Sequence, residues 1–128
     1  MSQFANSFRE LEIWKLAIEI AKSAYDLANK LPQTEQYGLS QQIRRSAVSL
    51  SANIAEGFRR SHRKEFKQFL HIALGSAGEL ETYCELCRVL FNGSAPDPNR
   101  LLKQIDQFER MTNAMIQALK LKMKVKKT

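Results

Sequence analysis

Residues 44–80 read RRSAVSLSANIAEGFRRSHRKEFKQFLHIALGSAGEL, and this stretch decides the fold class. Apolar residues recur three and four positions apart on both sides of Gly57, at Ala47, Leu50, Ile54, Phe66, Leu70, Ala73, Ala77 and Leu80. This spacing predicts two amphipathic helices joined by a short turn. We expect Gly57 to end the first helix in the left-handed conformation, and Ser61 to cap the start of the second.

The same spacing extends outward in both directions and predicts four helices, over about residues 8–30, 35–56, 62–91 and 98–123. Ser7 and Glu10 fit a capping box at the start of the first helix, and Asp97-Pro98 fits the start of the last. No convincing strand pattern is present. Heptad-like spacing with short connections predicts an all-α fold, an antiparallel up-and-down four-helix bundle that forms one domain over residues 1–128.

The first and third helices carry more apolar surface than one bundle seam needs. On the first helix we expect the core seam at Leu11, Trp14, Ile18, Ala21, Tyr25 and Ala28. A second stripe follows Ile13, Ala17, Ile20, Ala24 and Leu27, and the third helix has one at Phe69, Ile72, Tyr83, Leu86 and Leu90. The excess width predicts self-association, or else a wider core stripe. The small-residue run GSAG at 75–78 predicts close approach of a neighbouring helix.

The positive charge of the chain is concentrated in two segments. The net charge is +7, yet Phe58–Lys67 alone holds five Lys or Arg and one Glu, and Ala118–Thr128 holds five Lys and no acid. Local basicity of this kind attracts RNA, DNA or an acidic protein. We interpret the basic turn, defined as Arg59, Arg60, Arg63, Lys64 and Lys67, as the candidate phosphate-binding site.

Two further regions of the chain are basic. Arg44 and Arg45, on the predicted second helix, are additional candidates for contacts to nucleic acid. The Lys-rich segment 120–128 is interpreted as a solvated C-terminal tail, because such ends are common in chain termini.

The sequence contains no constellation typical of catalysis. Cys84-Glu-Leu-Cys87 lacks the two further ligands that a zinc site needs, so both cysteines are interpreted as buried apolar residues. The polar strip Arg45, Ser49, Asn53 and Glu56 is interpreted as a hydrogen-bonded network beside the turn. We therefore predict a protein that is not an enzyme and has no catalytic residue, metal or cofactor.

The location follows from two absences in the sequence. The N-terminus has no charged start followed by an apolar block, so no signal peptide is evident. No apolar run approaches the roughly 20 residues that span a bilayer. We expect a cytoplasmic protein that does not bind membranes.

Several motifs resemble a known family: Leu31-Pro32, Tyr37-Gly38-Leu39, Gln42–Ala47, the NIAEG run at Asn53–Gly57, and Gly75-Ser76 followed by Glu79-Leu80. They resemble the four-helix bundle proteins encoded within 23S rRNA intervening sequences, also called the S23 ribosomal protein family, over roughly residues 8–120. The resemblance implies a ring-like homopentamer with an RNA- or ribosome-associated role. A similar bundle is the accessory variability protein of diversity-generating retroelements, which engages a reverse transcriptase and nucleic acid.

Two functional hypotheses follow. The first is a homo-oligomeric protein that binds the backbone of rRNA or another structured RNA through the basic turn. The alternative is an accessory or adaptor subunit of a diversity-generating retroelement, which binds a reverse transcriptase and nucleic acid.

Overall fold

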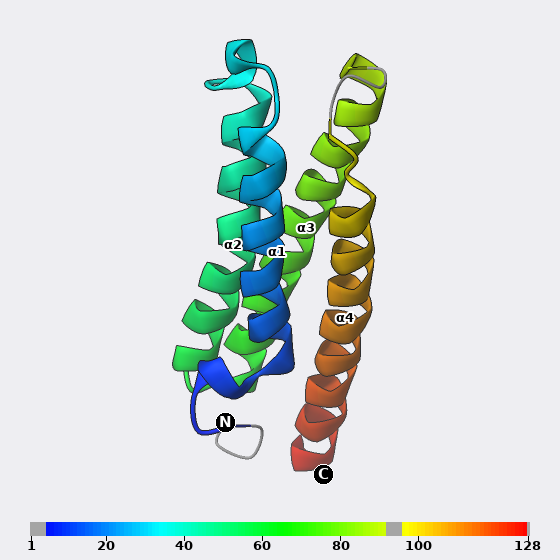
Figure 1. Ribbon diagram of the computed structural model, residues 1–128. Helices are drawn as coiled ribbons and strands as arrows, with labels where there is room; N and C mark the ends of the chain where they lie inside the picture. Colours follow the sequence, from blue (N-terminus) through cyan, green and yellow to red (C-terminus); the bar gives the residue numbers. More distant parts are fainter. Residues whose placement is uncertain (1–4, 92–95, 128) are drawn as a thin grey trace.

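The computed structural model describes residues 5–91 and 96–127, and over these ranges the chain is helical, with no strand (Figure 1). Two short 3-10 helices and four long α-helices follow one another along the chain. They are η1 (Phe8–Glu10), α1 (Glu12–Asn29), η2 (Gln33–Glu35), α2 (Leu39–Arg59), α3 (Arg63–Phe91) and α4 (Asn99–Lys127). The prediction of an all-α fold with four helices is confirmed. None of the described helices is both long and apolar enough to cross a membrane.

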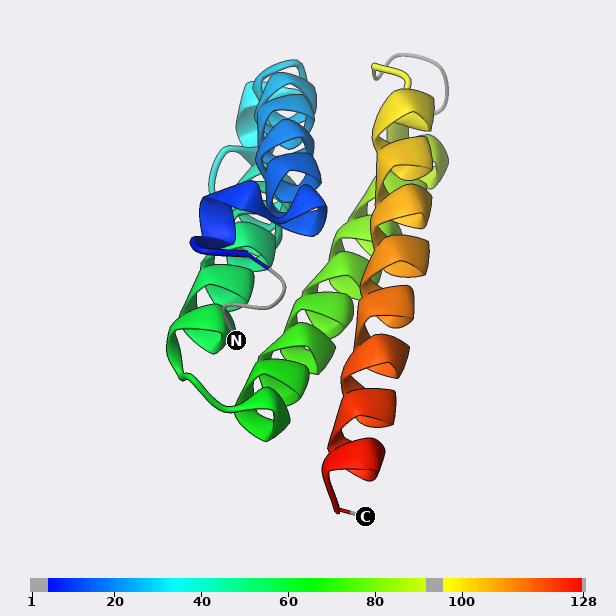
Figure 2. The same cartoon turned by 90° about the horizontal axis from the view of Figure 1, so that it is seen from below.

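Each long helix packs against two others: α2 against α1 and α3, and α4 against α3 and α1. The start of α1 lies beside Met111 and Met115 of α4, and its end lies beside Arg100 and Leu101 of the same helix. As a result η1, the turn between α2 and α3, and the last turns of α4 lie toward one end of the molecule (Figure 1). In both views α4 extends past the turn between α2 and α3 (Figures 1 and 2).

The core contains the apolar stripes that the sequence predicts for α2 and α3. The expected seam of α2 is fully buried, as Ile54 and Leu50 illustrate, and the α3 stripe is buried from Phe66 to Cys87. On α4 the buried stripe departs from alternating three- and four-residue steps at one place, where Ile116 is buried and Met115 is only half-buried. The whole stripe comprises Leu101, Ile105, Phe108, Thr112, Ile116 and Leu119. Tertiary packing therefore follows the 3.6-residue helical period more closely than a strict heptad.

The predicted seam of α1 is wrong in phase. The stripe expected to be secondary is buried in full, at Ile13, Ala17, Ile20, Ala24 and Leu27, whereas only Leu11 and Ala28 of the expected seam are buried. Ile18 and Tyr25, expected in the core, are 43% and 42% exposed. Both stripes are apolar, so periodicity alone does not say which one faces the bundle. The buried stripe holds two fully covered alanines, and small residues let neighbouring helices approach closely.

Several predicted helix boundaries also need correction. The capping box exists, because the Ser7 hydroxyl accepts from the Arg9 amide and the Glu10 carboxylate accepts from the Ser7 amide. It caps η1, however, and extended Leu11 separates η1 from α1. At the other end of the chain α4 runs to Lys127, so the segment 120–127 continues a helix, while Thr128 lies outside the described residues.

Gly57 does not end α2, which continues to Arg59. The left-handed residue is instead Ser61, with φ of 66°, so Ser61 is part of the turn and α3 begins only at Arg63. Gly75 and Gly78 also differ from expectation. A Cβ on either would meet nothing within 4 Å among the described residues, so these two glycines do not mark a close helix contact there.

Candidate functional site

The basic turn lies where α2 ends and α3 begins. Ser61 and His62 are the residues between Arg60, which caps α2, and Arg63, the first residue of α3. A connection this short brings cations from both helix ends to one place, as the sequence predicts. Arg59, Arg60 and Lys64 are exposed, while Arg63 and Lys67 are half-buried.

Arg60 mainly stabilises this turn. Its Nε donates to the Glu56 carboxylate at 2.9 Å, and its Nη1 lies 3.8 Å from the carboxylate of Glu65 on α3. The guanidinium also lies over the Phe69 ring, 5.2 Å from its centroid. These contacts join the end of α2 to the start of α3. They also partly neutralise the charge of Arg60, so less of it is available to a ligand.

Arg59 is arranged differently and shares an aromatic ring with a second arginine that the sequence pattern does not predict. Its guanidinium lies 5.3 Å from the centroid of the Phe8 ring, and the guanidinium of Arg9 lies 4.6 Å from the same centroid. Arg9 reaches this place because η1 packs against α2. Nothing in the local sequence pattern signals a contact between residues 50 positions apart, so Arg9 was not a candidate.

Arg63 begins α3 with its Nε buried and without a hydrogen-bond partner in the part of the chain that the structure describes. The free amide groups at the start of a helix favour anions as well. Together with exposed Lys64 and half-buried Lys67, Arg63 gives the start of α3 a concentrated positive potential.

The Lys-rich end of α4 lies toward the same end of the molecule (Figure 1). Lys120 is exposed on this helix, whose backbone continues to Lys127. Two segments far apart in the sequence, both rich in Lys or Arg, therefore lie toward one end of the bundle. Charge pattern alone predicts a solvated tail for the second of them, whereas the backbone of residues 120–127 is helical.

Arg44 and Arg45 do not join this site. They lie near the start of α2, roughly 22 Å from Arg59 at 1.5 Å per helical residue. Arg44 donates to the Asn29 amide oxygen at 2.6 Å and lies over the Tyr25 ring. It therefore packs α2 against α1.

Two of the four residues in the polar strip on α2, Ser49 and Asn53, form a hydrogen-bonded network that has a structural role. Asn53 donates to the carbonyl and hydroxyl oxygens of Ser49, both at 2.8 Å, and the Ser49 hydroxyl lies 2.8 Å from that of Ser76 on α3. This connection joins the two helices at mid-length. Glu56 pairs with Arg60 instead.

The cysteines are packed in the core. Burial raises the pKa of the Cys84 thiol to about 12, with a smaller contribution from Cys87, whose own pKa is raised by burial as well. Such thiols are poor nucleophiles and poor metal ligands at neutral pH. Within the described ranges no group of His, Cys, Asp or Glu side chains is arranged to hold a metal ion.

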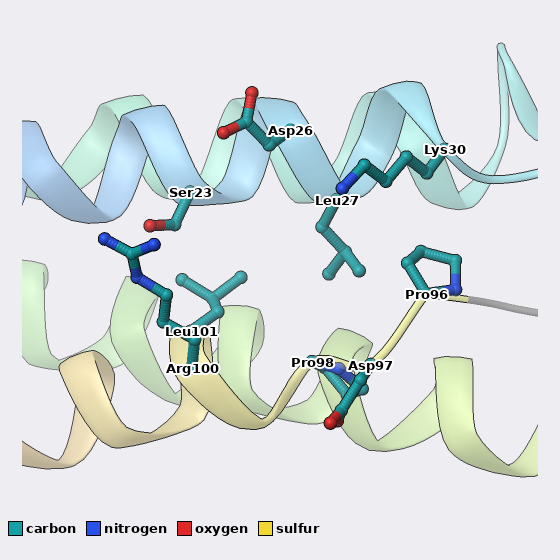
Figure 3. Close-up of a pocket in the computed structure, with 9 residues that line it drawn as sticks. All are labelled: Ser23, Asp26, Leu27, Lys30, Pro96, Asp97, Pro98, Arg100 and Leu101. Carbon is teal, nitrogen blue, oxygen red and sulfur yellow. The ribbon is translucent and has the colours of Figure 1, made fainter.

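A small cavity lies at the opposite end of the bundle, between α1 and the start of α4 (Figure 3). Its volume is about 150 Å³, and its charged lining residues are Asp26, Lys30, Asp97 and Arg100. Ligand pockets usually measure about 300–1,000 Å³. With two acids, two bases and so small a volume, this cavity does not provide a site for a cofactor.

Comparison with known proteins agrees with the resemblance in the motifs. The family model described as 23S rRNA-intervening sequence protein matches residues 9–114. The matched region includes Arg9 and the whole basic turn, and it ends before Lys120. A search of curated proteins finds no match.

Proposed function

This chain belongs to the 23S rRNA-intervening sequence protein family, and on that premise we propose that it binds the phosphate backbone of structured RNA, without being an enzyme. One observation carries the proposal. The basic turn, η1 and the Lys-rich end of α4 lie toward the same end of the bundle, and Arg9 of η1 shares the Phe8 ring with Arg59, although these residues come from three separate parts of the sequence.

The proposed contacts are charge-assisted hydrogen bonds to phosphate oxygens. Guanidinium groups match phosphate bidentately, and Lys64 and Lys67 add point charges nearby. Binding of this kind releases counterions, so its affinity falls steeply as salt increases.

Base readout has little support at this surface. Phe58 is half-buried, and its ring packs edge-on against buried Phe66 at a centroid distance of 5.9 Å. An aromatic ring held in this way is not a stacking platform for a base. We therefore expect recognition of RNA shape and charge rather than of sequence.

We propose further that the protein is a homo-oligomer, a pentamer as the family resemblance implies, built from antiparallel up-and-down bundles. The bundle arrangement is supported by the contacts of each helix with two neighbours. Self-association is supported by apolar side chains that the chain leaves exposed on two helices, Ile18 and Tyr25 on α1, and Ile72, Leu86 and Leu90 on α3. Repeating the basic end around an assembly raises avidity without strong single sites.

Fluorescence anisotropy with a structured RNA, measured over a series of salt concentrations, tests the RNA-binding proposal. The variant Arg59→Glu, Arg63→Glu, Lys64→Glu should lose at least about tenfold in affinity and show a shallower salt dependence. The control reverses three exposed cations at the other end, Lys30→Glu, Arg100→Glu and Lys103→Glu, with the same change in net charge.

An equal loss of RNA affinity in both triple variants would show that only net charge matters. That result would contradict the assignment of the basic turn as the binding site. Wild-type protein that fails to bind RNA even at low salt would overturn the function. That second result would favour the role of an adaptor that docks on a reverse transcriptase.

A further inference from the structure

Two guanidinium groups share one aromatic ring at the basic end of the bundle. Arg9 comes from η1 and Arg59 from the last position of α2, and they lie 4.6 Å and 5.3 Å from the centroid of the Phe8 ring. The two charges are therefore no farther apart than one Debye length, which is about 10 Å at 0.1 M salt. At this separation they repel each other, and an anion placed against both would be attracted by both.

Neither charge has a counter-ion among the residues that the structure describes. The carboxylate nearest to Arg9 in sequence is Glu10, and it accepts hydrogen bonds from the amides of Asn6 and Ser7 at 2.8 and 3.0 Å. The carboxylates of Glu56 and Glu65 form ion pairs with Arg60, the neighbour of Arg59 in sequence. The pair thus differs from Arg60, whose charge is already compensated.

The ring that holds the two guanidinium groups is itself fixed. Phe8 is only 9% exposed and packs against Trp14 with a centroid distance of 5.3 Å, and the capping box fixes the backbone of η1 around it. A guanidinium stacked on a fixed ring loses less conformational freedom when it binds than a free side chain does. Both arms are therefore arranged before a ligand arrives.

We propose that Arg9 and Arg59, held on the Phe8 ring, form a clamp for one phosphodiester group of a nucleic acid, which makes Arg9 a binding residue. This inference rests on the proposed function and adds to it a defined phosphate position beside the basic turn. Each guanidinium donates N–H groups to the phosphate oxygens, and the bound phosphate removes the repulsion between the two cations.

The test measures RNA affinity over a salt series for Arg9→Gln, Arg59→Gln and the double variant, with Arg100→Gln at the other end of the bundle as the control. We expect each single variant to lose about tenfold in RNA affinity. The slope of log affinity against log salt concentration should become shallower by about one unit. The double variant should lose less than the product of the two single losses, because both arms act on one phosphate. Arg100→Gln should bind as the wild type does.

A second measurement separates a clamp from simple charge. The only tryptophan of the chain is Trp14, which packs against Phe8, so its fluorescence reports on this cluster directly. Tripolyphosphate, which does not absorb in the tryptophan range, should change the Trp14 emission of the wild type and of Arg100→Gln but not that of Arg9→Gln.

The outcomes separate the two proposals. If Arg9→Gln binds RNA as tightly as Arg100→Gln while the triple reversal at the basic turn abolishes binding, the clamp is wrong and the proposed function stands. If the wild type binds no RNA at low salt, the proposed function itself fails. A Trp14 response to tripolyphosphate that is the same in Arg9→Gln would also overturn the clamp.

Discussion

The backbone of Gly57 lies so close to Phe69 that a Cβ atom on residue 57 would stand 2.5 Å from the Cβ of Phe69. The same atom would be 3.1 Å from Cδ1 of Phe66, which is fully buried. Gly57 is thus a point of close approach between α2 and α3, next to the basic turn. The last residue of the NIAEG run is needed for this packing, and the turn itself is made by Ser61.

Gly57→Ala should therefore lower the free energy of unfolding by about 1–3 kcal/mol, although alanine has the better helix propensity. The contact is with a Cβ atom near the backbone of α3, so the helices must move apart to admit the methyl group. Chemical denaturation measures the effect. The matched control is Gly78→Ala, where the methyl meets open space and should raise stability by up to about 1 kcal/mol. Equal stability of Gly57→Ala and wild type would contradict the close approach.

Thr112→Val should raise the free energy of unfolding by about 1 kcal/mol. Thr112 is fully buried in α4, and its hydroxyl finds no hydrogen-bond partner among the described residues. Replacing an unsatisfied buried hydroxyl with a methyl of similar size removes a desolvation cost. Thr82→Val serves as the control, because Thr82 is exposed and its hydroxyl donates to the Gly78 carbonyl; its effect should stay within about 0.5 kcal/mol. A loss of stability in Thr112→Val would show that the hydroxyl has a partner.

How far the sequence predicts this structure depends on whether a helix has one apolar stripe or two. On α2 the stripe through Leu50 and Ile54 is flanked by polar residues, so its phase is unambiguous and proves correct. On α1 two apolar stripes compete, and the choice is made by the neighbouring helices. Residues such as Ile18 are therefore placed wrongly by periodicity alone.

The candidate site shows the same limit. Charge density along the chain predicts the basic turn, since its residues are neighbours in sequence. The pairing of Arg9 with Arg59 depends on how η1 packs against α2, which no local pattern records. Arg44 was grouped with the site by its charge, but helix length puts it near the other end of α2.

Glu109→Gln should make stability less dependent on pH. Burial raises the pKa of Glu109 on α4 above its ordinary value of 4.5, and the charge of Glu81 on α3 raises it further. A carboxyl whose pKa is raised on folding stabilises the protein below the unfolded pKa. That contribution is lost as pH rises from 4.5 through the folded value. Thermal denaturation at pH 4 and pH 7 should show Glu109→Gln more stable than wild type at pH 7, by less than about 1 kcal/mol because the site is partly solvated.

The control for this effect is Glu19→Gln, which changes an exposed carboxyl on α1. Its free energy of unfolding at pH 7 should stay within about 0.5 kcal/mol of that of the wild type. If Glu109→Gln lowers stability at pH 7, the carboxylate is favourably placed in the folded state and the raised pKa is wrong.

Both cysteine thiols should resist modification in the folded protein. The pKa of Cys84 is raised to about 12 by burial, so almost no thiolate exists at pH 8, and Cys87 is likewise buried. A colorimetric thiol reagent at pH 8 should label the native protein slowly. In guanidinium, which unfolds the protein, the same reagent should label both cysteines rapidly. Addition of Zn²⁺ should not raise the melting temperature. Rapid labelling of the native protein would show that the thiols are accessible.

Ile72→Glu should dissociate the proposed assembly while leaving the fold intact. Ile72 is 51% exposed on α3, so a charge there costs little in a single chain but would be buried unpaired in an apolar interface. Light scattering after gel filtration should find a multiple of 14.7 kDa for the wild type and 14.7 kDa for the variant, with unchanged helical circular dichroism. Val48→Glu changes a residue on α2 that is 43% exposed and lies outside both stripes, and it should stay assembled. A monomeric wild type at micromolar concentration, or an Ile72→Glu variant that assembles normally, would contradict the interface on α3.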